Sequence, residues 1–438
     1  MISDLHLAEG NQGNGIYLGT ENFFADLPFE SFINHLLDHD SNQSSLIING
    51  DFVDFIRITH IPEGNDYSIW QSELKKAGKE YSIENLQESV SKKEKKYGLK
   101  THDFKCVWKL HKAIAGHAPV FMALAKWVDN GNELVITKGN HDIEWHWILL
   151  QDYFKCTLFD LSENRLKKSD FDHNISFKDS ARINDIHVEH GHRFEKMTSV
   201  KGNATLDPEG RPQELRMPMG SFFNRYLINK VEMYYPFVDN YKGGEKFAKI
   251  FFREKFTTAL KLLLDSGSYL FYILLKFKRK SLVELLLHFL SKGIPAILLA
   301  YALHQFIQSS DVLNRWLALL SLGPISVNIL FNFLFRIFGY SDKGLKDNAY
   351  DLARQNPEVN IVILGHNHNP EYDIRKGIHY INSGTWIPTH EVNQSIIRNS
   401  PLYTVIRIRT NETKSVCELL NWNPNTHCLE IFPSFKKT

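Results

Sequence analysis

Cysteine and net charge are both scarce in this chain of 438 residues. Its four cysteines form no C-x-x-C pair, which argues against a cysteine zinc site or a disulfide scaffold and is typical of a reducing cytosol. No signal peptide is visible, because the first motif already begins at Ile2. A buried first strand usually has several residues before its end, so we expect a longer N-terminus. The net charge of +1 favours no particular partner. From the cysteine usage and the lack of a visible signal peptide, we expect a cytoplasmic protein.

Charge is distributed unevenly along the chain. Residues 193–345 contain 21 Lys or Arg against 12 Asp or Glu, whereas the rest of the chain contains 30 against 38. A basic, apolar segment within an acidic body suggests that this segment contacts something anionic. The alternative is that the acidic part includes metal-binding carboxylates and a solvated surface. Nucleic acid is not the expected partner, because nucleic-acid binders usually present a basic surface that is not apolar.

Short apolar runs alternate with segments of helical spacing. The runs that predict buried parallel strands are Ser45–Asn49, Glu133–Thr137, Ile186–Glu189 and Asn360–Leu364. Helical spacing is clearest over Phe29–Leu37 and Phe104–Trp127. This alternation predicts an α/β fold, in which ligands bind at the carboxyl ends of the strands.

Five polar clusters directly follow apolar runs. They are Asp4-Leu5-His6, Gly50-Asp51-Phe52-Val53-Asp54, Gly139-Asn140-His141-Asp142, His190-Gly191-His192 and Gly365-His366-Asn367-His368. Together they offer carboxylates, imidazoles and one amide, a mixed oxygen and nitrogen set that suits Mn, Fe, Zn or Co better than calcium. Two such metals with a bridging carboxylate can stabilise both oxygens of an in-line displacement.

In their order, these motifs resemble those of the calcineurin-like metallophosphoesterase superfamily, which are D-x-H, G-D-x-x-D, G-N-H-D, an H-G or G-H step and G-H-x-H. A single motif is weak evidence, but five in order are very hard to obtain by accident. The resemblance covers roughly residues 2–192 and 360–386. It implies a four-layer αββα sandwich with metals at the shared edge of two facing sheets. A large, mostly helical insert interrupts this core.

The resemblance also implies two sets of metal ligands. The expected ligands of the first metal are Asp4, His6, Asp51 and His368. The expected ligands of the second are Asp51, Asn140, His190 and His366, with Asp51 bridging. We expect two divalent cations, Mn²⁺ first, with Fe or Zn as alternatives. The implied nucleophile is a metal-bridging hydroxide, because the metals lower the pKa of bound water.

Other motif residues are expected beside the metals. In relatives with G-N-H-D, the histidine, here His141, lies over the scissile phosphate as a general acid or charge stabiliser. Asp142, grouped with it, is expected to orient a neighbour. Asp54 is expected to contact the ligands from outside. Arg57 could touch a phosphate or form a surface ion pair.

The fourth motif leaves two histidines to choose between. His192 follows His190 by two residues and points the same way if the segment is extended. Relatives with an H-G-D step use its first residue as the ligand, so we favour His190. The role of His192 stays open.

The segment 193–345 has two borderline membrane stretches, Leu282–Ile307 and Val312–Phe338, since a spanning helix needs about 20 mostly apolar residues. The basic cluster Lys276–Lys280 beside apolar helices fits attachment to anionic lipid. The insert could be a cap over the metal site, a peripheral contact at the inner membrane, or a dimer interface or plain packed subdomain. A pair of spanning helices is the least favoured hypothesis.

The plan is similar to that of bacterial UDP-diacylglucosamine pyrophosphatases, which share the D-x-H start and have a helical cap that binds acyl chains. This chain departs from them at His141, where those enzymes typically have Arg, and in its much longer insert. The metal chemistry therefore carries over from the resemblance, and the substrate does not.

The sequence predicts a metal-dependent hydrolase of a phosphate ester or diphosphate, with a lipid-linked or amphiphilic substrate such as a UDP-diacylglucosamine-like molecule as the first hypothesis. The alternatives are a cyclic-nucleotide or other soluble phosphodiesterase or phosphatase, and, outside the enzymes, a non-catalytic scaffold or a membrane-associated interaction protein. We expect a discontinuous core of residues 1–192 and 346–438 around an insert of residues 193–345.

Overall fold

The computed structural model describes residues 1–11, 15–39, 43–200, 204–206, 213–234, 236–237, 241–242, 257, 344–393, 396–400, 402–410 and 415–432. The chain divides into two compact units, of which the first joins Met1–Leu263 to Gly344–Thr438 and the second is Leu264–Lys343. The second unit lies outside the described residues. The same holds for the segments that raised a membrane contact, which are Lys276–Lys280, Leu282–Ile307 and Val312–Phe338.

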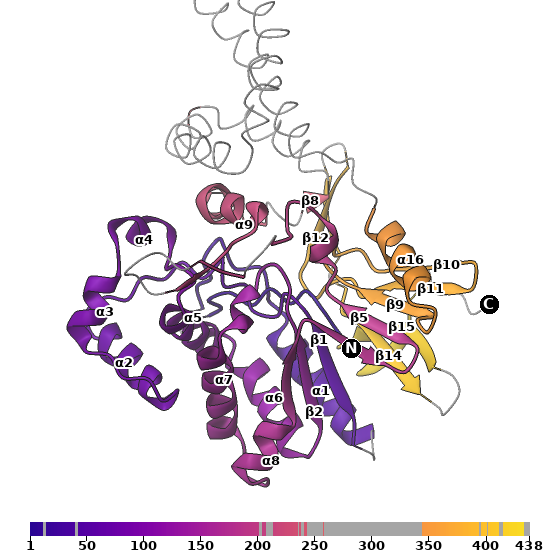
Figure 1. Cartoon of the computed structure of the whole chain (residues 1–438), viewed down its shortest axis with the longest axis horizontal. Coiled ribbons are helices and arrows are strands. Elements are labelled where there is room, and N and C mark those ends of the chain that lie inside the picture. The colour runs from indigo at the N-terminus through magenta and orange to yellow at the C-terminus, as the bar shows by residue number, and fades with distance from the viewer. Residues whose placement is uncertain are drawn as a thin grey trace, which may run out of the picture. The chain divides into compact units, whose positions relative to one another are not determined.

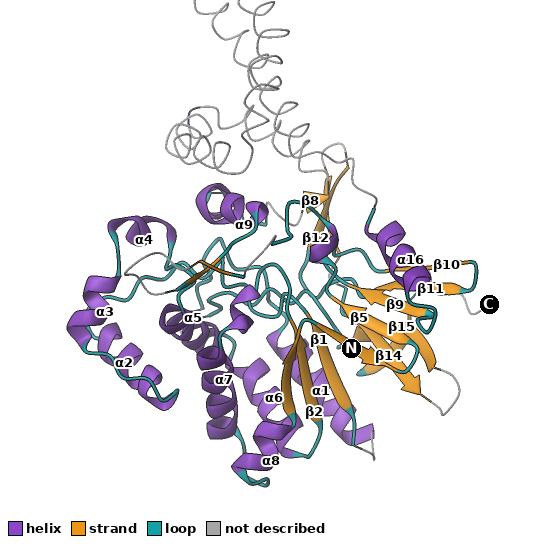
Figure 2. Cartoon of the chain, in the orientation of Figure 1, coloured by secondary structure: helices purple, strands orange, loops and turns teal. Residues whose placement is uncertain are grey.

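A parallel sheet forms where the apolar runs predict strands. β1 (Ser45–Asn49) pairs with β2 (Glu133–Thr137), which pairs with β3 (Ile175–Lys178), and all three are parallel. The bounds of β1 and β2 are those that the sequence predicts. Helices connect these strands, as parallel pairing requires, so the predicted mixed α/β class is confirmed (Figure 2).

A second sheet contains five strands in the order β10-β11-β9-β5-β4. β9 (Ile361–Leu364) lies between β5 (Ile186–Glu189) and β11 (Ile378–Asn382) and is parallel to both. β4 (Ser180–Ile183) and β10 (Glu371–Arg375) pair antiparallel at the two edges. The fourth and fifth motifs therefore follow neighbouring parallel strands, β5 and β9.

Residues 1 and 2 connect the first sheet to an antiparallel sheet near the other end of the chain. That sheet has the order β14 (Thr404–Thr410), β15 (Ser415–Asn423) and β16 (Cys428–Ile431). The backbone N–H of Ile406 donates to the Met1 carbonyl at 2.8 Å, and Ile2 forms a parallel bridge with Ile48. Smaller pairings involve β6 (Thr205–Leu206) with β7 (Glu214–Leu215), and β12 (Thr389–Asn393) with β13 (Ile396–Ser400) and β8 (Tyr241–Lys242).

Alternate residues of the strands face different apolar clusters, because successive side chains of a strand point to opposite faces. In β1, Ile48 belongs to a cluster formed mainly with helices. Ile47 belongs to a second cluster, which also contains Ile363 of β9. Val362 of β9 faces a third cluster with residues of α16 (Leu345–Gln355). The strands of both sheets therefore contribute to one shared core.

Helices pack against the first sheet, and α5, α6 and α7 lie along it (Figure 1). The helices before the fourth motif are α1 (Asp26–His39), α2 (Asp66–Lys76), α3 (Ile83–Ser89), α4 (Lys92–Tyr97), α5 (Asp103–Gly116), α6 (Ala118–Asp129), α7 (Ile148–Leu161) and α8 (Lys168–His173). Short 3₁₀ turns follow the third and fourth motifs at Ile143–His146 and His192–Phe194.

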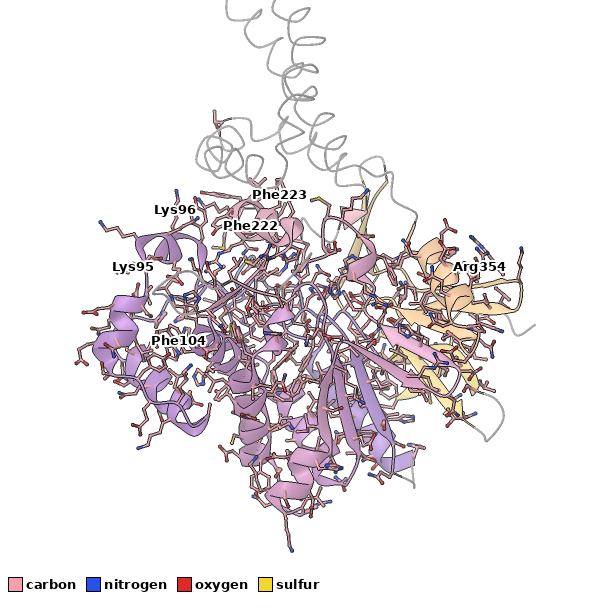
Figure 3. The ribbon with its side chains drawn as sticks, viewed as in Figure 1. Lys95, Lys96, Phe104, Phe222, Phe223 and Arg354 are labelled. Atoms are coloured by element: carbon pink, nitrogen blue, oxygen red, sulfur yellow. The ribbon has the colours of Figure 1, made fainter. Side chains whose placement is uncertain are left out.

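Residues 213–234, which we call the arm, belong to the first unit. The arm contains α9 (Met219–Phe223), a π-helical turn at Asn224–Ile228 and α10 (Asn229–Glu232). The Thr101 hydroxyl accepts from the Leu215 N–H at 3.0 Å, and the arm packs beside α4 through a ring contact of Tyr226 with Tyr97. Figure 3 shows Phe222 and Phe223 on α9, with Lys95 and Lys96 on α4. The sequence analysis grouped the arm with the insert, whereas here it packs on the core.

In the described part of the chain, no helix has both the length and the apolar character that crossing a membrane requires.

Candidate metal centre

The five motifs meet because their strands end at the same edge. Asp4 follows the Ile2 bridge, Asp51 follows β1, Asn140 follows β2, and His190 and His366 follow β5 and β9. The carboxyl ends of parallel strands are the usual place for ligands in such sheets. Side chains of these motifs form three groups. Within each group, the candidate ligand atoms all lie within 4.8 Å of one another.

The first group contains Asp4, His6 and His368. The Nε2 atoms of His6 and His368 are 3.0 Å apart, and His368 Nε2 lies 3.4 Å from Asp4 Oδ1. Asp51 Oδ2 lies 3.6 Å from His6 Nε2. These are the four residues expected around the first metal, and the structure brings them together.

The second group contains Asp51, His190 and His366. His190 Nε2 lies 3.1 Å from Asp51 Oδ2 and 3.2 Å from Asn140 Oδ1. The four residues expected around the second metal therefore also converge. Asp51 Oδ2 approaches His6 of the first set and His190 of the second, which is the position of a bridging carboxylate.

The chemistry of these donors fits two divalent metals. The set mixes buried carboxylate, imidazole and amide groups, which suits Mn, Fe or Zn. Burial alone raises the pKa of Asp51, but His190, His141 and His6 hold that pKa well below its usual value. Burial lowers the pKa of His190, but Asp51 and Asp4 raise it to about 10. The buried carboxylates thus require positive charge at this point, which bound cations would supply.

Backbone strain is concentrated at the same residues. Asp4, His6, Asp51, His366 and His368 all have positive φ, between 50° and 75°. A left-handed conformation costs roughly 1–2 kcal/mol for a residue with a β-carbon. Strained residues cluster at functional sites, where the surrounding structure holds them in place. Five such residues in one cluster, of which Asp4, His6 and Asp51 are buried, point to a site selected for geometry rather than for stability.

Residues around the ligands orient them. His190 Nδ1 lies 3.0 Å from the Asn49 carbonyl oxygen, which leaves Nε2 for a metal. The Ser3 hydroxyl donates to Asp4 Oδ2 at 2.5 Å, and the Thr385 hydroxyl donates to the Asp4 carbonyl at 2.7 Å. These contacts fix both the side chain and the backbone of the first ligand.

His141 and Asp54 form a buried pair beside the ligands. Asp54 Oδ2 lies 2.8 Å from His141 Nδ1 and 3.1 Å from Nδ1 of the ligand His6. Burial raises the pKa of Asp54, but His141, His6 and Arg57 hold it far below its usual value. His141 also belongs to a third candidate group with His6 and Asp51, so its ring lies at the edge of the candidate metal site, although no ligand role was expected for it.

Asp142 faces the backbone. Its carboxylate accepts hydrogen bonds from the N–H groups of Gly139 at 2.6 Å and Phe52 at 2.8 Å, and from Trp145 Nε1 at 3.1 Å. Burial and the nearby Asp51 raise its pKa to about 7. It is a member of none of the three ligand groups found among the described residues. These contacts match a residue that orients its neighbours.

Arg57 lies inside the protein. Its side chain is 2% exposed, and Nε lies 3.0 Å from Asp54 Oδ2. Its Nη1 contacts the carboxylate of Glu232 in α10. The structure thus places Arg57 in a buried ion-pair chain rather than in a surface ion pair.

His192 lies apart from the ligands. Its ring centroid is 5.6 Å from that of His190, and both rings line a cavity of about 500 Å³. His190 belongs to a candidate ligand group, whereas His192 belongs to none of the groups found among the described residues. Burial, with repulsion from the charges of His190 and His366, lowers its pKa to about 3. The structure therefore separates the two histidines that the sequence left as alternatives.

Three residues at the site could not be identified from the amino-acid sequence. Glu195 Oε2 lies 3.1 Å from His366 Nε2, and the Thr198 hydroxyl lies 3.4 Å from the same nitrogen. Both follow the fourth motif, in a segment with no strand or helix signal that could have revealed them. Glu232 is a third such residue, since it lies 175 positions from its partner Arg57.

A cleft of about 360 Å³ lies over the ligands. Its base includes Asp51, Asn140, His141, His366 and His368, and its other side is formed by the arm through Gly220, Phe223, Asn224 and Ile228, together with Thr198 and Asn367. The cleft thus has a polar side, formed by the candidate ligands, and a partly apolar side.

Comparison with known proteins finds no family model, no curated protein and no solved structure that matches this chain.

Proposed function

We propose that this protein is a dinuclear metal-dependent phosphoesterase. The observation that carries the proposal is the position of Asp51, whose Oδ2 lies 3.6 Å from His6 Nε2 and 3.1 Å from His190 Nε2. One carboxylate shared by two mixed oxygen and nitrogen ligand groups is the arrangement that two-metal phosphoester hydrolysis needs. The resemblance of the five motifs to the calcineurin-like metallophosphoesterases agrees with it.

We propose further that the core is a four-layer αββα sandwich. The support comes from the three apolar clusters, one between helices and the first sheet, one shared by both sheets, and one between the second sheet and α16. In that architecture the carboxyl ends of β1, β2, β5 and β9 share one edge, which is where the ligands belong.

The residues around the cleft have separate roles in the proposed reaction. Asp4, His6, Asp51 and His368 would hold one cation, and Asp51, Asn140, His190 and His366 the other. When bound, the two cations supply Lewis-acid stabilisation and an activated water. Nδ1 of His141 faces Asp54, and Nε2 would donate a proton to the leaving oxygen. Such general acid catalysis contributes about 10²–10⁴-fold.

The cleft favours a substrate with an apolar part beside the phosphate. Phe223 and Ile228 of the arm line it opposite the ligand residues. This supports a lipid-linked or otherwise amphiphilic phosphate ester or diphosphate, hydrolysed in the cytoplasm or at the surface of the inner membrane. A cyclic nucleotide or other soluble phosphodiester is the alternative substrate class.

The proposal is tested with bis-p-nitrophenyl phosphate and p-nitrophenyl phosphate in the presence of Mn²⁺, Fe²⁺ or Zn²⁺. We expect about two metals per chain and metal-dependent turnover in the wild type. Asp51→Asn should lose both metal and activity, since it removes the shared ligand. His141→Ala should keep the metal and lose about 10²-fold in kcat.

The control variant is Asp347→Asn, which changes an exposed carboxylate paired with Arg375 and should match the wild type. A folded wild type that holds no stoichiometric metal would contradict the proposal and support the non-catalytic scaffold. Metal binding without turnover of either ester would move the test to amphiphilic diphosphates before the hydrolase proposal is abandoned.

A further inference from the structure

Four ionisable side chains form a continuous buried chain from the arm to the cleft. Glu232 contacts Arg57 Nη1, Arg57 Nε lies 3.0 Å from Asp54 Oδ2, and Asp54 Oδ2 lies 2.8 Å from His141 Nδ1. Glu232 and Asp54 are fully buried, Arg57 is 1% exposed and His141 is 8% exposed. A buried charge is costly unless it is paired, so each member of this chain depends on its neighbour.

The guanidinium of Arg57 couples the positions of the Asp54 and Glu232 carboxylates. It is planar and presents its N–H groups in a fixed fork, so its orientation is set at both ends, by Asp54 at Nε and by Glu232 at Nη1. The Arg57 backbone N–H also donates to Asp54 Oδ1 at 3.2 Å. Removing the Glu232 charge would take away the carboxylate that faces Nη1.

Close packing fixes α10 over the second motif. Asn229 Nδ2 donates to the Ile56 carbonyl at 2.9 Å, one residue before Arg57. On the other side, Gly19 approaches the Glu232 carbonyl oxygen so closely that a β-carbon at Gly19 would collide with it. α10, which carries Glu232, is therefore held by a side-chain hydrogen bond of Asn229 and by close backbone packing against Gly19.

We propose that Glu232 is a positioning residue for His141, acting through Arg57 and Asp54. The inference rests on the proposed function, because it assigns a task to the His141 side chain of that site. It gives α10 a role in orienting the general acid. The same arm lines the cleft through Phe223, Asn224 and Ile228, so the segment that contacts the substrate also orients the general acid.

The test compares phenyl phosphate with p-nitrophenyl phosphate. A general acid matters more for the poorer leaving group, which is phenol. Glu232→Gln should therefore lower kcat for phenyl phosphate about 10-fold or more and affect p-nitrophenyl phosphate clearly less, with KM and metal content unchanged. Glu232→Asp should recover part of the loss, and adding Glu232→Gln to His141→Ala should change kcat no further.

A second measurement does not depend on turnover. In the zinc-loaded protein, the imidazole N–H protons that face Asp54 should give low-field proton resonances, and the one lost in His141→Ala identifies His141. Glu232→Gln should shift this resonance. The matched control is Glu214→Gln, which removes another carboxylate of the arm, paired with Lys100 at 2.9 Å, and should leave both the resonance and the kcat ratio unchanged.

The outcomes separate the two proposals. Equal losses for both esters, with lower metal content or an unshifted His141 resonance, would overturn the positioning role and leave Glu232 a structural residue. A wild type that binds metal and hydrolyses neither ester concerns the proposed function instead, whose test then moves to amphiphilic diphosphates. The position of the His141 resonance in Glu232→Gln still decides the inference in that case.

Discussion

Single residues at this site are constrained by space as much as by chemistry. Gly139, which opens the third motif, lies against Asp51, and a β-carbon there would collide with Asp51 Oδ1 and press on the Asp51 backbone nitrogen. The glycine is therefore required because the shared ligand occupies the space of its missing side chain. Its φ is not in the left-handed region, so contact rather than conformation decides the residue type.

Gly139→Ala should displace the Asp51 carboxylate. We expect metal affinity to fall at least about 10-fold, as for other changes that disturb ligand orientation, and the free energy of unfolding to drop by about 1–3 kcal/mol from overpacking. Metal titration and urea unfolding of the metal-free protein measure the two effects. Gly344→Ala is the control, because a β-carbon there meets nothing within 4 Å. Unchanged affinity in Gly139→Ala would show that Asp51 can shift without cost.

Elements are joined by a second buried ion cluster, away from the metal ligands. His117 lies at the junction of α5 and α6, with Nε2 3.2 Å from Glu21 and Nδ1 2.9 Å from Asp26. Glu21 also accepts from the N–H groups of Gly10 and Phe23, at 2.6 and 2.8 Å. The loop that follows the first motif is thereby attached to the helices.

This cluster predicts a pH dependence of stability. Burial lowers the pKa of His117, but Glu21 and Asp26 raise it to about 9, above its ordinary value of 6.5. The stabilisation from a raised pKa is complete below the unfolded value and is lost as the pH rises through the folded value. We expect the free energy of unfolding to fall by up to about 3 kcal/mol between pH 6.5 and 9.

Urea unfolding across this pH range measures the effect. His117→Gln should flatten the dependence, whereas His39→Gln, at an exposed position, should keep it. If the wild type and His117→Gln lose stability in parallel, the charge on His117 is not the cause.

At the scale of the whole molecule, the ligands come from both ends of the chain. Asp4 and His368 lie in one ligand group, although they are separated by 364 positions. Ile406 near the C-terminus pairs with Met1, beside the first ligand. Any metal bound here must therefore stabilise the folded arrangement of the discontinuous core, because the unfolded chain has no preformed site.

Metal removal should consequently destabilise the core. At a free metal concentration about 1,000 times the dissociation constant, binding contributes about 4 kcal/mol. We expect EDTA to lower the urea midpoint of the wild type and Mn²⁺ to restore it. Asp51→Asn should show little difference between the two conditions. An equal midpoint with and without metal in the wild type would mean that the ligand groups do not bind it.

Local features of the fold could be predicted from the amino-acid sequence. Apolar runs bounded by glycine motifs predicted β1 and β2 to the residue, and the polar residues after each strand identified the side chains that converge. These predictions succeed because strand burial and the placement of ligands at strand ends are local properties, visible within a few residues.

The distant residues that complete the site could not be predicted, because they come together through tertiary packing. The contact of Arg57 with Glu232 and that of His366 with Glu195 join segments that share no periodic pattern. The packing of the arm on the core was equally invisible, since its composition matched the apolar, basic segment that follows it. Buried ion pairs depend on which surfaces pack together after folding, and neither residue spacing nor composition predicts which surfaces those are.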